Sequence, residues 1–274
     1  MMNTNEHRSS WAAFLFPVIQ FVMVAATVYV FISGRFAPPK AITAAGEAID
    51  LQYHMTLVVA AVVFILSQLG LAYVVLKYRD HGQKVHFTRG NNKLEAVWTS
   101  LTAILFIGLG LLGGKAWANG RMFNPDANPD VIRIEVTENQ FVFNFRYPGP
   151  DGKFGRIDPT KIDSSLGNPL GLDSSDPASA DDIVVPTLTV PVNQEVELLL
   201  RSQDVIHSFF VRELRLQQDA VPGLIVAVRF KAEQIGKYEV VCTQLCGLGH
   251  SNMHTYLSVV SQEDYAAFLK SNAQ

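Results

Sequence analysis

Charged residues are missing from three long stretches of this 274-residue chain. No Lys, Arg, Asp or Glu occurs in residues 9–34, 51–76 or 96–114. Because about 20 apolar residues in a helix cross the roughly 30 Å hydrocarbon core of a bilayer, these stretches predict three membrane-spanning helices. Buried core helices are the alternative, but runs this long and this free of charge disfavour them. The predicted helices lie near Trp11–Ser33, Met55–Leu76 and Ala96–Ala116.

A C-x-x-C-H segment is also missing, and the chain has two cysteines in all. This absence excludes a fused domain that carries a covalently attached c-type haem. The N-terminus lacks the basic region of a signal peptide, since Arg8 is its only basic residue before the apolar run. The run is also too long for a signal peptide. We therefore favour an uncleaved first helix, although the small residues 43–46 would permit cleavage.

Basic residues gather between the second and third predicted helices. The loop holds five basic residues and one acid: Lys77, Arg79, Lys84, Arg89 and Lys93, with Asp80. Short basic loops stay in the cytoplasm. The third helix therefore leads outward, and everything after it is predicted to be extracytoplasmic. An uncleaved first helix that starts in the cytoplasm agrees with this orientation.

From Asp130 onward, short segments alternate apolar and polar residues with a period near two. The segments are 131–137, 140–147, 195–202, 205–211, 225–230, 237–242 and 255–261. Turn residues separate them, as at Pro191–Asn193 and Pro222–Gly223. Strands at this spacing predict an antiparallel β-sandwich or barrel. Ser261, followed by Asp264, predicts the N-cap of a closing helix.

Residues 148–182 interrupt this pattern and are rich in Pro, Gly, Ser and Asp, which predicts a long surface loop. Its DSSD run at 173–176 offers oxygen ligands to a hard cation but lacks the spacing of a calcium loop. The chain from Asp130 to the end contains 19 acidic and 12 basic residues, a balance of −7. This balance is ordinary for a soluble domain and would also steer a basic partner. The imbalance alone does not separate these readings.

The stretch CTQLCGLGHSNMH holds both cysteines in a C-x3-C-x3-H-x2-M arrangement. Its potential metal donors are Cys242, Cys246, His250 and Met253. The stretch begins at the end of a predicted strand, and its two glycines allow a tight loop. Another histidine, His207, lies 35 residues before Cys242 on a different predicted strand. A ligand there would tie the loop to the sheet.

Three readings of these donors compete. A disulfide is permitted outside the cytoplasm, but it does not explain the histidines and the methionine. A tetrahedral zinc site would use both cysteines with His207 and His250, and it leaves Met253 idle. Copper accepts thiolate, imidazole and thioether together. Because a mononuclear blue-copper site needs only one cysteine, the set fits two copper ions better.

This donor set resembles the binuclear CuA motif of subunit II of the haem-copper oxygen reductases, the cytochrome c oxidases. The resemblance covers roughly residues 52–270 and implies a membrane-anchored cupredoxin domain. It implies two bridging thiolates, two capping imidazoles and two weak axial donors: Cys242 and Cys246, His207 and His250, and Met253 with the backbone carbonyl of Gln244. The predicted fold is then three transmembrane helices followed by a cupredoxin-like β-sandwich or barrel. The predicted domains are 1–50 with the extra helix, 51–120 as a helical hairpin, and 130–274 as the outer domain.

The resemblance also implies a function. Electrons from an extracytoplasmic donor of the cytochrome c type would enter through copper and pass to haem in subunit I. There, oxygen is reduced to water with proton translocation, so the catalytic centre lies outside this chain. The implied partners are subunit I with its haem and CuB, the other oxidase subunits, the donor and the membrane, and none is a nucleic acid. The implied location is a bacterial plasma membrane.

Two departures from the family pattern stand out. The family usually has Glu between the cysteines, where its carboxylate helps to hold magnesium, and Gln244 offers a weaker amide oxygen. The copper site keeps its backbone carbonyl, whereas magnesium is in doubt. The family commonly has Trp at the position of Phe141, in the aromatic path through which electrons enter. Phe141, Phe143 and Phe145 keep the aromatic character on one predicted strand face, or simply form core.

Two further segments share the resemblance. In KLEAVWTS (93–100), Glu95 matches an acid at the cytoplasmic mouth of a proton channel in some branches, or is a helix-start carboxylate that the dipole favours. In DAVPG (219–223), Asp219 is a candidate for water or proton exit at the interface with subunit I. A copper-free quinol-oxidase subunit would lack the ligands present here. A membrane-tethered copper-binding cupredoxin without an oxidase role is the alternative function.

Overall fold

The computed structural model describes residues 11–79, 84, 87, 89–121 and 130–273. These residues form two compact units. One contains Leu51–Gly113 together with the chain before Pro39, and the other contains Pro39–Asp50 together with the chain after Gly113. Arg8 and Asp80, named above, lie outside the described residues.

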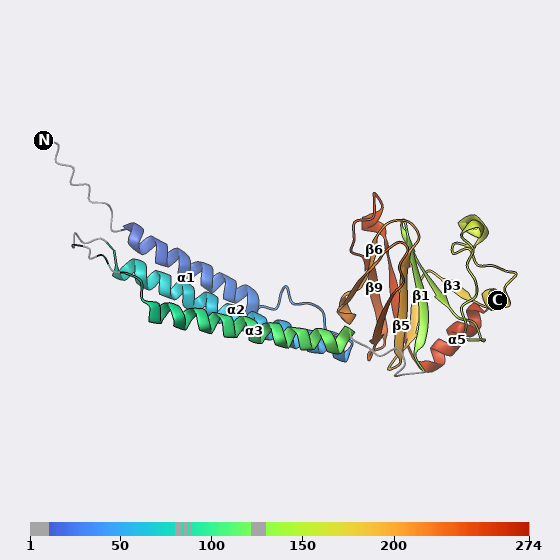
Figure 1. The fold of residues 1–274 in the computed structure, drawn as a ribbon, viewed down its shortest axis with the longest axis horizontal. Helices are drawn as coiled ribbons and strands as arrows, with labels where there is room; N and C mark the ends of the chain where they lie inside the picture. Colours follow the sequence, from blue (N-terminus) through green and yellow to red (C-terminus); the bar gives the residue numbers. More distant parts are fainter. Residues whose placement is uncertain (1–10, 80–83, 85–86, 88, 122–129, 274) are drawn as a thin grey trace. The chain divides into compact units, whose positions relative to one another are not determined.

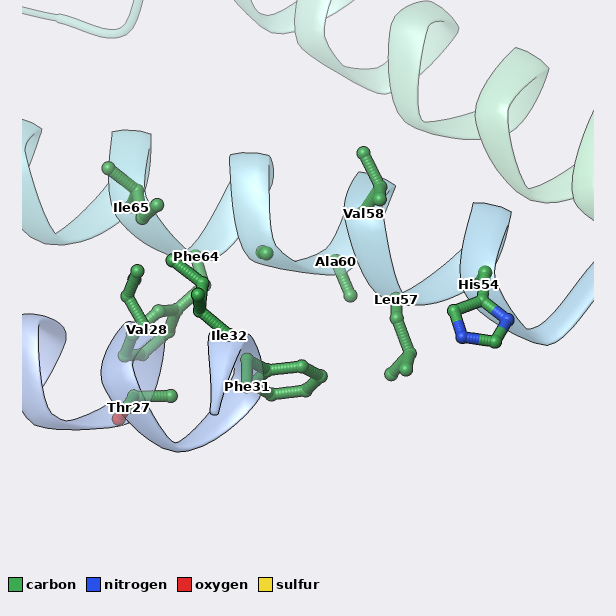
Figure 2. A pocket seen from close by; sticks show the side chains of 11 residues that line it. Thr27, Val28, Phe31, Ile32, His54, Leu57, Val58, Ala60, Phe64 and Ile65 are labelled. Carbon is green, nitrogen blue, oxygen red and sulfur yellow. The ribbon is translucent and has the colours of Figure 1, made fainter. Parts of the chain in front are cut away.

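Three long helices, α1 (Trp11–Ile32), α2 (Ala44–Lys77) and α3 (Asn92–Arg121), carry the apolar runs. Each is long and apolar enough to cross a membrane, which confirms the three predicted spans. Their membrane portions lie side by side in Figure 1. A hydrogen bond joins α1 to α2, because Gln20 Nε2 donates to Gln68 Oε1 at 3.0 Å. An apolar cavity of about 390 Å³ lies further along the same helix pair, between side chains such as Val28 and Phe64 (Figure 2).

Helix α2 begins at Ala44 rather than near Met55 as predicted. Its first turns contain the acidic residues Glu47 and Asp50, so absence of charge marks only the membrane portion. The Thr43 hydroxyl accepts a hydrogen bond from the Gly46 N–H at 2.9 Å, which caps the helix. The first turns belong to the same unit as the β-strands, where Asp50 accepts two hydrogen bonds from Arg215 at 2.7 and 2.9 Å.

Among the described residues, ten strands form two five-stranded sheets. The first sheet has the order β3 (Ile183–Val185), β2 (Val142–Tyr147), β1 (Ile132–Asn139), β5 (Glu195–Ser202) and β8 (Val226–Lys231). The second has the order β4 (Leu188–Pro191), β10 (His254–Val260), β9 (Gly236–Cys242), β6 (His207–Val211) and β7 (Leu216–Ala220). The predicted sandwich is confirmed. The pairs β1–β5 and β10–β4 are parallel rather than antiparallel, because the chain leaves each sheet and returns to it.

The core lies between the two sheets. Phe143 of β2 meets Phe209 of β6 edge to face, with ring centroids 6.4 Å apart. Tyr147 of β2 is buried, and its hydroxyl donates to the Thr189 carbonyl and accepts from the Thr189 N–H. These contacts fix the first sheet on the second. Helix α5 (Gln262–Asn272) closes the chain with Ser261 as its N-cap, as predicted.

The predicted surface loop at 148–182 contains three short helical turns, η1 (Pro159–Lys161), η2 (Ser164–Leu166) and α4 (Pro177–Ala180). Each is N-capped by an aspartate, which accounts for much of the acidic composition. The first acid of the DSSD run, Asp173, accepts hydrogen bonds from Arg156 at 2.9 Å and Lys161 at 2.5 Å. Cations of the chain itself therefore already neutralise this carboxylate.

Candidate metal centre

The donors predicted from the sequence come together at one end of the second sheet. Cys242 ends β9, and the loop that follows carries Cys246, His250 and Met253 before β10 begins. The Cys246 sulfur lies 3.9 Å from the Cys242 sulfur, 3.6 Å from His250 Nδ1 and 3.8 Å from Met253 Sδ. The Gln244 carbonyl oxygen lies 3.2 Å from the Cys242 sulfur. The loop thus gathers sulfur, nitrogen and oxygen donors around one point.

The loop is compact because it joins two adjacent antiparallel strands. His254 of β10 pairs with Val241 of β9, and the Cys242 N–H donates to the Met253 carbonyl at 3.1 Å. Gly247 has a φ of +141°, a backbone conformation that residues other than glycine rarely adopt. The short turn η4 (His250–Asn252) follows, and its first N–H donates to the Gly247 carbonyl at 3.1 Å. This turn directs His250 toward Cys246.

His207 reaches the centre from β6, the strand next to β9. Its Nε2 atom lies 2.7 Å from Oδ1 of Asp204, which favours the tautomer with the proton on Nε2. Its Nδ1 atom is buried and has no hydrogen-bond partner among the described residues. The donor atoms of His207, Cys242 and Cys246 lie within 4.8 Å of one another. A metal ion bound beside the two thiols would give this buried Nδ1 lone pair a partner.

Both cysteines are buried free thiols in the structure. Burial and the neighbouring Cys242 raise the pKa of Cys246 to about 11. Desolvation raises the pKa of Asp204, but hydrogen bonds from His207 and from two backbone N–H groups outweigh it and hold this pKa below its ordinary value. The centre therefore combines a protonated Cys246 thiol with an ionised carboxylate behind the imidazole. A cation would replace the proton of this thiol.

The donor chemistry distinguishes among metals. Met253 is 1% exposed, so its thioether belongs to the centre and not to the surface. Zinc sites are built from thiolate, imidazole and carboxylate, whereas copper also takes thioether sulfur. Two thiols, two imidazoles, a thioether and a carbonyl exceed what one tetrahedral ion needs. The residues present therefore fit a two-copper group.

Phe141 lies just outside strand β2 and packs against the core cluster that contains Phe143 and Phe145. Strand β2 begins at Val142, and Phe141 lies in the turn before it, half-buried. A Cβ atom on Gly249 would lie only 2.4 Å from the Phe141 ring, so the ring packs directly against the ligand loop. Phe143 and Phe145 are buried core residues, stacked with centroids 6.4 Å apart. Phe141 thus contacts both the core and the ligand loop, and strand periodicity does not reveal the second contact.

The remaining candidates lie elsewhere. Glu95 is in the first turn of α3, where the helix dipole favours a carboxylate. Asp219 is half-buried on β7, opposite Ser208 of β6. His254, which has no assigned role, is exposed, with Nδ1 4.0 Å from the Glu239 carboxylate.

Two residues near the centre and one buried acid were missed from the sequence. Asp204 contacts His207, and Gln140 Nε2 donates to the Cys246 carbonyl at 2.6 Å. Glu138 is fully buried, and both of its carboxylate oxygens lack a partner among the described residues. Burial and, secondarily, the charge of Asp219 raise the pKa of Glu138 well above its ordinary value. The acid three residues before His207 was an available signal, whereas Gln140 and Glu138 had none.

Comparisons with known proteins agree with this arrangement. Residues 134–260 match the family model described as cytochrome c oxidase subunit II, periplasmic domain, and residues 34–113 match its transmembrane domain. The chain is 32% identical over 225 residues to an alternative cytochrome c oxidase subunit 2 of Bradyrhizobium diazoefficiens, covering 81% of this chain and 79% of that protein. It is 30% identical over 232 residues to cytochrome c oxidase subunit 2 of Cereibacter sphaeroides, covering 78% and 72%.

A solved structure of the periplasmic domain of cytochrome oxidase subunit II from Bradyrhizobium japonicum is also similar. It is 26% identical, covers 53% of this chain and 95% of its own, and has a TM-score of 0.39. The two family models and the relatives together span both the apolar helices and the sandwich. The chain therefore belongs to the cytochrome c oxidase subunit II family, a component of haem-copper oxidases whose oxygen chemistry takes place in subunit I.

Proposed function

We propose that this chain binds a binuclear copper group, CuA, and that electrons pass through it from an extracytoplasmic donor to haem in subunit I. One observation carries the proposal. The buried thiols of Cys242 and Cys246 meet His207, whose buried Nδ1 has no hydrogen-bond partner among the described residues. The copper group would be held by two thiolates, two imidazoles, a thioether and a backbone carbonyl: Cys242, Cys246, His207, His250, Met253 and Gln244.

The chain holds these donors in a rigid frame. When bound, CuA supplies a one-electron relay with its charge shared over two metal ions. Phe209 of β6 pairs with Cys242 of β9, so His207 and Cys242 are fixed by one hydrogen-bonded sheet. Asp204 orients the His207 ring, as carboxylates behind metal-bound imidazoles generally do. Burial of both cysteines and of Met253 shields the sulfur ligands from water.

We propose one residue for electron entry and one for proton uptake. Phe141 packs against Gly249 of the ligand loop and is the proposed point at which electrons enter from a donor of the cytochrome c type. The acidic outer part of the chain would attract a basic donor. Glu95, at the start of α3, is the proposed acid at the cytoplasmic side of a proton channel.

The residue between the two cysteines, Gln244, bears on magnesium binding. The Gln244 side chain is exposed, and its amide is a weaker magnesium ligand than a carboxylate, so we expect low magnesium occupancy at the interface with subunit I.

The named relatives from Bradyrhizobium and Cereibacter are bacterial, which supports a bacterial inner membrane with the sandwich on the periplasmic side. We propose the domain division 1–50, 51–120 and 130–274 for this orientation.

Copper loading of the purified full chain in detergent tests the proposal. We expect two coppers per chain, a purple colour and an electron paramagnetic resonance signal shared over both coppers. A blue single-copper spectrum or a colourless zinc form would reject the CuA assignment. Purification of the complex from membranes tests the oxidase role separately. Haem subunits should accompany this chain, and their absence would favour a membrane-tethered copper-binding protein.

A further inference from the structure

The turn between β1 and β2 touches the metal centre from the opposite sheet, although none of its residues is a proposed ligand. Gln140 in this turn makes two hydrogen bonds toward the centre. Its side-chain Nε2 donates to the Cys246 carbonyl at 2.6 Å, and its backbone N–H donates to Asp204 Oδ2 at 2.8 Å. The other oxygen of Asp204 contacts His207 at 2.7 Å. Gln140 therefore links Cys246 and His207, which lie on different elements.

The ligand loop rests on this turn. A Cβ atom on Gly247 would lie 2.9 Å from Gln140 Nε2, and one on Gly249 would lie 2.4 Å from the Phe141 ring. The two glycines therefore let the loop approach the turn more closely than other residues could. On its outer side the loop presents Leu245 and Leu248, which are 77% and 105% exposed. Within this chain, Gln140 and Phe141 of the β1–β2 turn contact the loop and support it.

We propose that Gln140 is a positioning residue that sets the location of the Cys246 sulfur relative to Cys242 and His207. The proposal rests on the CuA function proposed above. The amide donates to the Cys246 backbone carbonyl and not to its sulfur, so it acts through the placement of the loop. The spectrum and potential of a bound copper pair would depend on where the chain holds its thiolate ligands. A loop released from Gln140 would shift the Cys246 sulfur relative to Cys242 and His207.

Gln140→Met tests this role, because methionine keeps the length of the side chain and removes the donor. Gln203→Met is the matched control. Gln203 lies in the β5–β6 turn, is exposed, and donates to the carbonyl of Pro169 at 3.2 Å, away from the ligand loop. Gln140→Lys is the rescue variant, since its amine reaches as far and can donate to the same carbonyl.

The first measurement uses the copper-loaded full chain in detergent. We expect Gln140→Met to retain two coppers and to show a larger copper hyperfine splitting, a shifted visible spectrum and a changed reduction potential. Gln203→Met should match the wild-type protein, and Gln140→Lys should restore most of the wild-type spectrum. A Gln140→Met spectrum and potential identical to those of the wild type, even with a lowered melting temperature, would overturn the proposal.

The second measurement uses the copper-free full chain and separates this proposal from the CuA assignment. We expect the thiols of Gln140→Met to react with a soluble disulfide reagent roughly threefold to tenfold faster than those of the wild type, as loss of one ordinary hydrogen bond would allow. Gln203→Met should react at the wild-type rate. If wild-type protein fails to form the binuclear centre but the thiol rates differ as expected, only the CuA proposal fails. Equal thiol rates in both variants would contradict the positioning role.

Discussion

The Nε2 atom of His207 lies 2.7 Å from Oδ1 of Asp204, and this contact leaves the buried Nδ1 atom as the ring nitrogen without a hydrogen-bond partner among the described residues. The donor atoms of His207, Cys242 and Cys246 lie within 4.8 Å of one another. The carboxylate accepts the Nε2 proton, so Nδ1 carries the lone pair. Asp204 sits three residues before His207, in the turn that leads into β6, and backbone N–H groups of Gln140 and Val205 hold it in place. The contact thus selects the nitrogen that a metal can bind.

Asp204→Asn should weaken copper binding. The new amide can donate to Nε2, which moves the imidazole proton to Nδ1 and blocks the proposed ligand atom. Removal of a partner behind a metal-bound imidazole typically lowers metal affinity by ~10- to 100-fold. Competition with a copper chelator would measure the loss. Glu239→Gln is the control, since Glu239 sits beside the exposed His254, and its copper affinity should be unchanged.

Copper affinity should rise with pH. Because the pKa of Cys246 is raised to about 11, its thiol is protonated near neutral pH and must lose the proton when metal binds. Each proton released strengthens binding by about tenfold per pH unit. Titrations at pH 6, 7 and 8, corrected for the chelator, would show the slope. A pH-independent affinity would mean that the thiol is already ionised without metal.

Glu138→Gln should stabilise the protein at high pH. The raised pKa of Glu138 means that the folded state keeps a proton that the unfolded chain releases, so this group's contribution to stability falls as pH rises from the ordinary carboxyl pKa through the raised one. A neutral amide removes the ionisation cost, which we place at ~1–3 kcal/mol for a buried unpaired group. Thermal unfolding of the full chain in detergent at pH 8 and pH 5 should show a gain that shrinks at the lower pH.

The control for Glu138 is again Glu239→Gln, because Glu239 is 49% exposed on its side chain and lies on the outer part of the sandwich. Its substitution should leave the melting temperature nearly unchanged at both pH values. If Glu138→Gln raised stability equally at pH 5 and pH 8, packing and not ionisation would explain the gain.

Gln20→Leu should loosen the first helix from the second. The variant loses the hydrogen bond to Gln68 and leaves that amide oxygen without this donor. Interhelical hydrogen bonds in membranes contribute ~0.6 kcal/mol on average and up to ~1.7 kcal/mol. Unfolding in micelles with a rising fraction of sodium dodecyl sulfate, followed by circular dichroism, would measure the change. Replacing Gln20 and Gln68 together by Leu should cost no more than replacing either one.

Ser67→Ala is the matched variant for this experiment. Its exposed hydroxyl donates to the Val63 carbonyl within α2, so its loss leaves the α1–α2 contact in place. We expect its unfolding midpoint to remain that of the wild type. A midpoint for Gln20→Leu that also stayed unchanged would show that the amide pair does not hold the helices together.

The sequence predicted elements wherever a strong periodic signal was present. The strand β5 spans the predicted residues Glu195–Ser202, and Ser261 caps α5 as expected. The strand β7 was missed because its sequence, LQQDA, is largely polar and gains its place by pairing with β6. The start of α2 was misplaced because a helix continues past the membrane where capping and tertiary contacts support it.

The sequence by itself determined the three apolar spans, the β-sandwich and the five proposed side-chain donors, since charge-free length, period-two alternation and residue type can be read along the chain. The sixth proposed donor, the Gln244 carbonyl, came from the family resemblance. Tertiary structure alone decided what surrounds those donors. Gln140 and Asp204 lie 64 residues apart, yet a hydrogen bond joins them. Asp204 contacts His207, and Gln140 donates to the Cys246 carbonyl. Glu138 loses water only because two sheets close over it. Burial and contacts between distant residues depend on how strands pack, and no local pattern records that packing.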